Sequence, residues 1–499
     1  MKTGTLISLA LYFILMIGIG LYAWRKSTDS SEGYLLGGRQ LHPAVAALSA
    51  GASDMSGWLL LGLPGALFAS GLVSAWIGIG LFFGALLNWI IVAPRLREQT
   101  ERLGNALTIP EFLANRFPDR ALALRVTSAL IVVVFFAVYT AAGLVGGGKL
   151  FETSFAALFG DIGIPDYTLG LWITAGVVLA YTMVGGFLAV SLTDFVQGCI
   201  MVVALVLMPL VVMFGPGGSA GESLTQVQPG FLDLTYGLTT VGFFSAVAWG
   251  LGYFGQPHII VRFMAVRSVK AVATARNIGM TWMFVCLVGA LGVGLAGRAY
   301  AARNGIVVED PETIFIVLAD LLFHPLITGF LLAALLAAIM STISSQLLVS
   351  SSSLTEDFYK LFLRKNASER ESVNVGRICV LLVSLVAILI ASDPNSEVLG
   401  LVSNAWAGFG AAFGPMILLS LTWKRMSGAG AVAGLLTGAV VVVGWIALGW
   451  GKSFMGGEGV YEIIPGFIAS FIAVVAVSLM TEPAPFEEVA DDPAPQPAE

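Results

Sequence analysis

Runs of apolar residues long enough to cross a lipid bilayer recur along almost the whole of this 499-residue chain. An α-helix needs about 20 mostly apolar residues to span a hydrocarbon layer about 30 Å thick. Hydrophobic residues make up 57% of the sequence and charged residues only 11%, whereas soluble domains carry about 25% charged residues. A protein core has no room for so much apolar surface, so lipid must cover it. The sequence therefore predicts an all-α polytopic membrane protein.

The apolar runs predict thirteen transmembrane helices. They fall at residues 4–24, 42–70, 72–94, 123–148, 167–185, 188–214, 237–261, 277–300, 325–353, 374–392, 397–423, 430–450 and 462–480.

The basic residues predict how these helices are oriented. If the N-terminus lies outside, all but five of the 25 Lys and Arg fall in cytoplasmic loops. Arg262 is one of the residues expected in a cytoplasmic loop. Cytoplasmic loops are enriched in Lys and Arg, so we expect an external N-terminus, an odd number of spans and a cytoplasmic C-terminus. The five exceptions are Lys2, Lys149, Arg298, Arg303 and Lys452.

The end of the chain and the absence of enzymatic motifs limit the remaining function classes. From Thr481 onwards the sequence is acidic and rich in Pro and Ala, a composition typical of a disordered tail. The sequence has no phosphate-binding loop, no dinucleotide fingerprint after a strand and no zinc-protease motif. We therefore expect no enzymatic activity, no organic cofactor, no nucleic-acid partner and no obligate protein partner; the lipid bilayer is the expected surrounding.

The second apolar run is interrupted by the polar stretch "SAGASDMSGW" at residues 49–58. Glycines and serines there surround Asp54, and a carboxylate within a membrane span is expensive and usually functional. Secondary transporters bind their substrates and ions at such discontinuous helices, because unwinding frees backbone carbonyls and amides. Unwound backbone is tolerated at membrane depth only inside protein or beside a cavity.

A second interruption is expected at "AWGLGYFGQPH", residues 248–258, where three glycines precede Pro257. Glycine weakens a helix interior, and proline removes a donor and clashes with the preceding turn. The two interruptions lie five spans apart, and an odd number inverts the second half relative to the first. We therefore predict an inverted-repeat core. The expected units are a first helix and inner loop at 1–41, a first repeat at 42–214, a second repeat at 215–425, two further spans at 426–480 and the tail at 481–499.

A third polar feature lies in the run 325–353. Ala338, Ser341 and Thr342 are spaced i, i+3, i+4, so they share one helix face. Two hydroxyls and one carbonyl from this helix, with two carbonyls from the first interruption, would form a cage of five oxygens without formal charge. Such a cage suits Na⁺ better than Ca²⁺, which prefers carboxylates.

Structural explanations stay open for each of these features. Asp54 and Asp194 can be hydrogen-bonded structural acids, and Ser341 and Thr342 can be small polar residues at a helix interface. The glycines at 250–255 can simply permit close helix contact. Periodicity alone favours ordinary core positions for the aromatic residues Tyr139, Trp249 and Tyr253.

Five longer motifs resemble the solute:sodium symporter family over about residues 5–475. They read "GGRQLHPAVAALSAGASDMSGWLLLGLPGALF", "GGFLAVSLTDFVQ", "AWGLGYFGQPHIIVRFMA", "SSSLTEDFYK" and "SNAWAGFGAAFGPMILLSLTW". The resemblance implies a LeuT-type 5+5 inverted-repeat core within thirteen spans, in the cytoplasmic (inner) membrane of a bacterium. It also implies Na⁺-coupled uptake of L-proline by alternating access, with Na⁺ as the co-transported ion.

The resemblance further implies roles for individual residues. Carbonyls of Ala52, Met55 and Ala338 and hydroxyls of Ser341 and Thr342 would bind Na⁺, with Asp54 linked to that site. Arg39 would assist sodium access from the inner side, and Asp194 is a further candidate. The implied substrate-binding residues are Ser56, Gly57, Trp58, Tyr139, Trp249, Tyr253 and Pro257.

Other functions remain alternatives at this stage. The same scaffold can carry another small organic solute, such as a different amino acid or a pantothenate-like acid. A Na⁺-responsive sensor would usually need an attached signalling domain, which the sequence lacks. A channel needs a continuous pore with repeated filters, and two interruptions with one neutral cage favour a gated site instead.

Overall fold

The computed structural model describes residues 3–27, 36–155, 163–214 and 229–485. Every regular element in these ranges is an α-, 3₁₀- or π-helix, and the sole β-type contact among them is an isolated bridge between Leu41 and Val266. The expected disordered tail lies outside the described residues from position 486 onwards. An all-α fold is therefore observed, as the composition predicts.

The first part of the chain forms the following helices: α1 (Thr3–Ser27), η1 (Gly37–Arg39), α3 (Pro43–Asp54), η2 (Trp58–Gly62), α4 (Leu63–Ser70), η3 (Leu72–Ser74), α5 (Ala75–Leu87), η4 (Asn88–Val92), α6 (Ala93–Arg102), α7 (Ile109–Arg116), η5 (Pro118–Arg120), α8 (Ala121–Leu150), η6 (Phe151–Phe155) and α9 (Asp166–Phe214). The second part forms α11 (Thr240–Val247), η7 (Ala248–Gly255), α12 (Pro257–Ala265), α13 (Val269–Asn304), η8 (Pro311–Thr313), α14 (Ile314–Leu322), α15 (Pro325–Leu354), η9 (Thr355–Leu363), α16 (Glu369–Ile390), α17 (Val398–Thr422), α18 (Gly428–Ala447) and α19 (Ile463–Met480).

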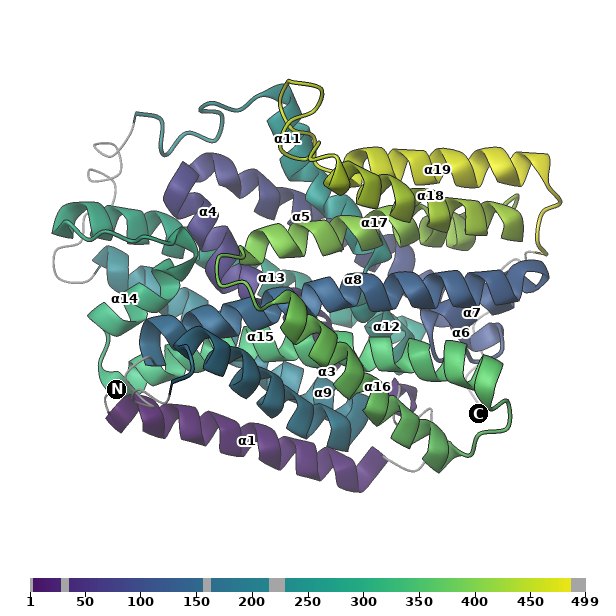
Figure 1. Cartoon of the computed structure of the whole chain (residues 1–499), viewed down its shortest axis with the longest axis horizontal. Helices are drawn as coiled ribbons and strands as arrows, with labels where there is room; N and C mark the ends of the chain where they lie inside the picture. The colour runs from purple at the N-terminus through teal and green to yellow at the C-terminus, as the bar shows by residue number, and fades with distance from the viewer. Residues whose placement is uncertain (1–2, 28–35, 156–162, 215–228, 486–499) are drawn as a thin grey trace, which may run out of the picture.

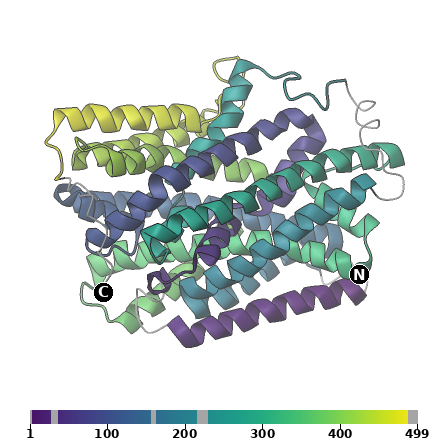
Figure 2. The same cartoon turned by 180° about the vertical axis from the view of Figure 1, so that it is seen from behind.

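The long helices run roughly side by side, with α1 along one flank and α18 and α19 along the opposite one (Figures 1 and 2). Within the most apolar stretches of α15 and α17, 83% of the residues are buried, against 28% in α1 and in α19. A helix that is apolar all round is stable only inside protein or in lipid. The central pair α15 and α17 therefore forms the core, while α1 and α19 present apolar surface to lipid.

The two ends of this bundle differ in what they carry. One end holds α6, α7 and the C-terminal end of α15, and the other holds α14 and the N-terminal end of α15 (Figure 1). We call them the inner and the outer end, following the predicted orientation, which stays a prediction.

The number of membrane spans is close to the expected thirteen but is not fixed by the structure. Among the described residues, ten helices are long and apolar enough to cross a bilayer, and the bent pair Pro43–Asp54 and Trp58–Ser70 makes an eleventh. The two other expected spans correspond to a shorter apolar helix, Asp166–Ala180, and to the segmented run of α11, η7 and α12. Thirteen spans, and the division into two repeats, stay predictions.

The helix α9 contains the boundary expected between the fifth and sixth spans. Its backbone leaves the helical region at Gly186, where φ is 59° and ψ is −154°. This left-handed φ is easily reached only by glycine. Gly186 therefore divides α9 where the sequence places the end of one span and the start of the next.

The chain beyond α19 is more ordered at first than we expected. Residues 481–485 begin the expected disordered tail, yet the Ala484 amide donates to the Met426 carbonyl at 3.1 Å. The Arg116 guanidinium, from α7, donates to the Pro485 carbonyl at 2.7 Å. The composition did not reveal this contact, because it depends on a tertiary neighbour at the inner end.

Candidate functional site

The first predicted interruption is present between α3 and η2. The α-helix ends at Asp54, Met55 leaves helical geometry with ψ at 76°, and the chain resumes at Trp58 after a bend of 62°. The Asp54 carbonyl accepts hydrogen bonds from the Ser56 amide at 2.9 Å, the Trp58 indole at 3.0 Å and the Tyr139 hydroxyl at 3.4 Å. One backbone amide and two side chains thus satisfy a carbonyl that the broken helix leaves without its usual partner.

The second predicted interruption is also present, as a change of helix type. The segment η7 is a 3₁₀-helix, Gln256 is extended with ψ at 105°, and α12 begins at Pro257. A Cβ atom on Gly250 would lie 2.3 Å from the Gly80 carbonyl oxygen, and one on Gly252 would lie 1.9 Å from the Trp406 indole nitrogen. The glycines therefore serve both purposes considered above, interruption and close helix contact.

The two interruptions meet through one hydrogen bond. The Tyr253 hydroxyl, from η7, donates to the Asp54 carboxylate, which is only 2% exposed. The Tyr253 ring packs edge-on against Trp406 of α17, with ring centres 4.9 Å apart. The Trp406 indole in turn donates to the Trp249 carbonyl at 2.7 Å. Asp54 is therefore linked through η7 to the central helix α17.

Four of the five predicted Na⁺ ligands come together between α3 and α15. The Ser341 hydroxyl donates to the Ala52 carbonyl at 2.7 Å, and the Thr342 hydroxyl lies 3.5 Å from the same oxygen. Both hydroxyls also lie within 3.2 Å of the Ala338 carbonyl. Met55, the fifth predicted residue, is fully buried at the end of the same interrupted helix. All of these groups are neutral oxygens, the donor set expected for a monovalent cation.

The described residues contain no group of three or more His, Cys, Asp or Glu that could hold a metal ion. A carboxylate-rich divalent site of the kind that Ca²⁺ prefers is therefore absent from this part of the chain.

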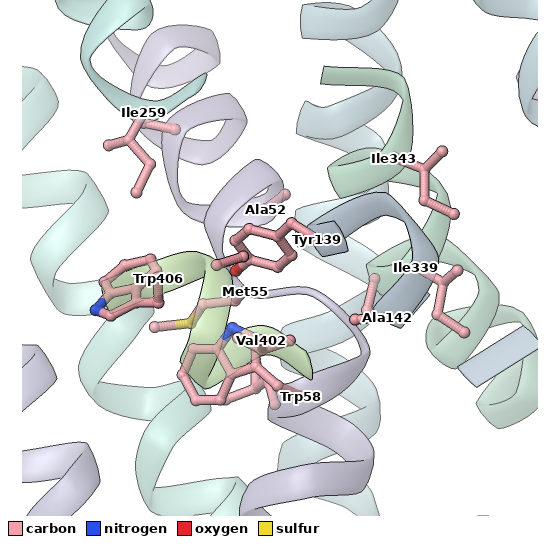
Figure 3. Close-up of a cluster of buried hydrophobic side chains, with 14 of the residues drawn as sticks. Ala52, Met55, Trp58, Tyr139, Ala142, Ile259, Ile339, Ile343, Val402 and Trp406 are labelled. Carbon is pink, nitrogen blue, oxygen red and sulfur yellow. The ribbon is translucent and has the colours of Figure 1, made fainter. Parts of the chain in front are cut away.

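Most of the predicted substrate residues lie around the first interruption. Ser56 lies in the non-helical link together with Met55, and Gly57 already has helical backbone angles. Trp58 is buried, and the Tyr139 hydroxyl reaches the link from α8. Figure 3 shows Met55, Trp58 and Tyr139 together at the break, with Ile339 and Ile343 of α15 on one side and Trp406 on the other.

Trp249 lies on η7, where its ring stacks on Tyr461 with ring centres 5.2 Å apart and an angle of 28°.

Pro257 is set apart from the other predicted substrate residues. It lines a separate cavity towards the inner end, beside Val132, Phe187 and Ser353, and Thr108 at the start of α7 closes part of its wall. None of the other predicted substrate residues lines this cavity. The structure therefore places Pro257 between the central site and the inner end.

Arg39, just before α3, forms hydrogen bonds with residues at the inner end. Its guanidinium donates to the Met264 carbonyl at 2.9 Å and to the Ala106 carbonyl at 2.6 Å. The side chain is only 6% exposed, and its φ of 52° is unusual for a residue other than glycine. Arg39 thus connects α12 and the loop before α7, some distance from the oxygen cluster described above.

Asp194 is paired with Arg262 deep inside the protein. The guanidinium lies 3.2 Å from the carboxylate, and Ser49 donates to the same carboxylate oxygen at 2.8 Å. Arg262 also donates to the Ser345 hydroxyl at 2.5 Å, one turn after Ser341 on α15. Assigning Arg262 to an inner loop was wrong: it is fully buried within α12, because Asp194 neutralises its charge.

Several residues of the site were missed from the sequence. Gln256 donates from within the second interruption to the Gly252 and Trp406 carbonyls, both at 3.1 Å. Trp406 and Tyr461 come from α17 and the loop before α19, far away in the sequence. Arg262 carried a usable signal, since a charge inside an apolar segment is rarely accidental; the aromatic partners carried none.

Comparisons with known proteins show which transporters the chain is similar to. The chain is 53% identical to the osmoregulated proline transporter OpuE of Bacillus subtilis over 97% of this chain and 96% of the relative. It is 54% identical to the high-affinity proline transporter PutP of the same organism, over 95% and 98% of the two chains. It is 51% identical to a sodium/proline symporter of Staphylococcus aureus, over 96% and 93%.

Two solved structures share the fold. A substrate-bound, outward-open Na⁺-coupled sialic acid symporter matches with a TM-score of 0.79 at 19% identity, over 97% of this chain and 99% of the other. MHP1, a nucleobase-cation-symport-1 family transporter in a closed conformation, matches with a TM-score of 0.57 at 15% identity, over 93% and 97%. At these identities the likeness concerns the fold alone.

The interrupted helices and the surrounding bundle define a multi-pass membrane transporter with a LeuT-type fold, not an enzyme. The sodium:solute symporter family model matches residues 34–438, and the chain belongs to this family. The resemblance noted in the sequence is thus confirmed.

Proposed function

We propose that this protein couples the uptake of L-proline to the entry of Na⁺ by alternating access. It would do so in the cytoplasmic membrane of a bacterium, with its N-terminus outside and its C-terminus in the cytoplasm. Three relatives more than 50% identical over nearly their whole length are named as proline transporters or sodium/proline symporters, which supports this substrate and ion.

The observation that carries the proposal is the contact between α15 and the interrupted helix α3. Two hydroxyls of α15 converge on the Ala52 carbonyl, which lies three residues before the break at Met55. Na⁺ would replace these hydrogen bonds by direct coordination from Ser341, Thr342 and the carbonyls of Ala52, Met55 and Ala338. A cation bound there would hold α15 against α3 and fix the geometry of the break.

Asp54 would transmit the effect of Na⁺ to the substrate. Its neighbour Met55 supplies a proposed Na⁺ ligand, and its carboxylate accepts the hydrogen bond from Tyr253 in the second interruption. Binding of Na⁺ on one side of the break therefore orders Tyr253 on the other. This link would explain how the ion raises the affinity for the substrate, since coupling requires a ligand to favour one state over another.

We further propose where proline binds. The backbone around Ser56, Gly57 and Trp58 lies at the start of the outer half of the interrupted helix, where the positive end of the helix dipole favours a carboxylate. The rings of Tyr139, Trp249 and Tyr253 would cover the pyrrolidine ring.

Pro257 lines the cavity towards the inner end, so the substrate would pass it during release. Arg39 and Asp194 would act on the inner side, where ions leave.

The energetics are sufficient for concentrative uptake. Proline carries no net charge, so one Na⁺ per proline moves one charge. A tenfold Na⁺ gradient supplies about 1.4 kcal/mol, and a potential of about 100 mV adds about 2.3 kcal/mol per charge. Together they would support an accumulation on the order of several hundredfold at one-to-one coupling.

Uptake by proteoliposomes that contain the purified protein tests the proposal. We expect labelled L-proline to accumulate under an inward Na⁺ gradient, to saturate, and to be displaced by unlabelled proline but not by unrelated amino acids. Uptake that is equal in Na⁺ and in choline, from protein shown to be folded, would refute Na⁺ coupling. Na⁺-dependent uptake of a different solute would refute only the substrate.

A further inference from the structure

A small chamber lies beside the interrupted helix. Met55 lines it, whereas the other four predicted Na⁺ ligands do not. Asp54 and Gly51 of α3 line it, together with Asn88 and Trp89 of η4 and Gly279 of α13. Its volume is about 20 Å³. On the same measure, one water molecule needs about 10–15 Å³. The chamber can therefore hold a water-sized guest and nothing as large as proline.

Among the described residues, three polar side-chain atoms of the lining residues Asp54 and Asn88 have no hydrogen-bond partner. They are the Asp54 carboxylate oxygen that does not accept from Tyr253, and both the oxygen and the nitrogen of the Asn88 side-chain amide. The two residues are only 2% and 1% exposed. A buried polar group without a hydrogen bond costs about 1–3 kcal/mol, so such groups are normally satisfied by protein or by bound water.

The position of Asn88 is itself unusual. It is the first residue of η4, a π-helical segment within an otherwise α-helical span. π-Helical segments are rare and frequently occur at functional sites. The rest of the chamber wall is largely apolar and includes Ile259, Met280 and Met283. Asn88 is therefore an isolated amide that shares the chamber with a transport-linked carboxylate.

We propose that the chamber binds a water molecule between Asp54 and Asn88, and that Asn88 is a positioning residue for the Asp54 carboxylate. The water would donate one hydrogen to the open carboxylate oxygen and exchange a second hydrogen bond with the Asn88 amide. Water fits better than a cation, because the amide nitrogen is a donor that repels positive charge and only one carboxylate is present.

The consequence concerns the orientation of Asp54. Tyr253 fixes one carboxylate oxygen and the water fixes the other, so the carboxylate has a single orientation at the break. This orientation in turn holds the backbone of Met55, which is the next residue. Asn88 would thus influence Na⁺ binding from the face of α3 opposite to Ser341, a step that rests on the function proposed above.

A high-resolution structure of the full protein in lipid nanodiscs, determined in Na⁺ and in choline buffer, tests the ligand. We expect density at about 2.7–3.0 Å from the Asp54 carboxylate in both buffers, as for a hydrogen-bonded water. Density at about 2.4 Å that disappears without Na⁺ would identify a cation and overturn the proposal. An empty chamber in both buffers would overturn it as well. This test does not depend on transport.

Two variants test the positioning role by different means. Asn88→Leu removes both polar atoms at nearly constant size. Gly279→Ala leaves the amide intact but adds a methyl group to the chamber wall, at ordinary contact distances of 3.7–3.8 Å from Ala47 and Trp89. The matched control is Gly78→Ala on α5, which adds a methyl group outside the chamber, 3.6 Å or more from its neighbours.

We expect both chamber variants to lose the water density and to raise the half-saturating Na⁺ concentration for proline binding at least threefold, while the KM for proline at saturating Na⁺ changes less than twofold. The control should change neither. If Asn88→Leu does not fold, Gly279→Ala decides alone. Water that persists in a folded Asn88→Leu, or unchanged Na⁺ dependence once the water is lost, would refute the positioning role. Absence of any Na⁺ dependence in the unmodified protein would instead refute the proposed function.

Discussion

The hydroxyl of Tyr253 donates a hydrogen bond to the carboxylate of Asp54, and so joins the two interrupted segments of the bundle at one point. Both side chains are buried, at 2% exposure each. The hydrogen bond connects α3, which approaches α15 through Ala52, to η7, which contacts α17 through Trp406. A structural change in α3 should therefore affect η7, and a change in η7 should affect α3.

Removing this hydroxyl should weaken Na⁺ binding more than proline binding. Tyr253→Phe keeps the ring that packs on Trp406 and deletes only the donor to Asp54. A hydrogen bond to a charged group contributes about 1.5–3 kcal/mol, so we expect the half-saturating Na⁺ concentration to rise about tenfold. The measurement is uptake as a function of Na⁺ at saturating proline. Tyr167→Phe is a matched control, because that hydroxyl donates to the Ala391 carbonyl, away from the site.

Removing the hydroxyls of α15 should also lower the apparent Na⁺ affinity. Ser341→Ala and Thr342→Val each delete one of the two side-chain oxygens that approach the Ala52 carbonyl. We expect each to raise the half-saturating Na⁺ concentration about tenfold or more, because a coordinating oxygen is lost from a neutral site. Thermal stability should change little.

The control for the α15 variants is Ser420→Ala, which deletes a buried hydroxyl that donates to the Ile417 carbonyl of its own helix. An equal loss of Na⁺ affinity in this control, or normal affinity in both α15 variants, would contradict the assigned site.

The buried pair of Asp194 and Arg262 should show strong non-additivity. Removing one partner leaves an uncompensated charge in the protein interior, which costs about 3–5 kcal/mol. We expect Asp194→Asn and Arg262→Gln each to destabilise the protein by about 3 kcal/mol or more, and the double variant to lose clearly less than the sum. The measurement is a double-mutant cycle on the free energy of unfolding. A double variant whose loss equals the sum would show that the pair is not coupled.

Glu462, in the loop before α19, should make the stability of the wild-type protein depend on pH. Burial raises the pKa of this carboxyl above its ordinary value, and one of its oxygens has no hydrogen-bond partner within the described part of the chain. The pKa of Glu462 in the folded state exceeds its pKa of about 4.3 in the unfolded state. The folded state of the wild-type protein is therefore more stable at low pH. It loses stability as the pH rises through the window between the two values.

Glu462→Gln has no charge to desolvate, so the variant should match the wild type near pH 4 and melt at a higher temperature near pH 7.5. Thermal melts at both pH values, with the exposed Glu309→Gln as a control, provide the check. A variant that is less stable than the wild type at pH 7.5 would show that the carboxylate has a stabilising partner.

The sequence was most informative where composition and local geometry decide the structure. Apolar runs revealed the helical membrane fold, and the polar stretch at 49–58 and the glycines with Pro257 revealed both interruptions, because backbone propensity acts locally. The i, i+3, i+4 spacing correctly placed Ala338, Ser341 and Thr342 on one face. The assignment of these residues to Na⁺, and of the aromatic residues to proline, stays a prediction.

The sequence was least informative where distant segments meet. The contacts of Tyr253 with Asp54 and of Arg262 with Asp194 join residues far apart in the chain, and no local pattern specifies such pairs. Asn88, within the expected span 72–94, was not singled out from the sequence. Its unsatisfied amide becomes visible only once α3 and α13 enclose it.

Equilibrium binding of labelled L-proline to the purified protein, measured across Na⁺ concentrations for the wild type and Asp54→Asn, tests the central claim most directly. The link from Na⁺ through Asp54 to Tyr253 predicts that proline binds tightly only with Na⁺, and that the variant needs at least tenfold more Na⁺ for half-maximal binding while remaining folded. Equal proline binding without Na⁺, or the same Na⁺ dependence in both proteins, would contradict it.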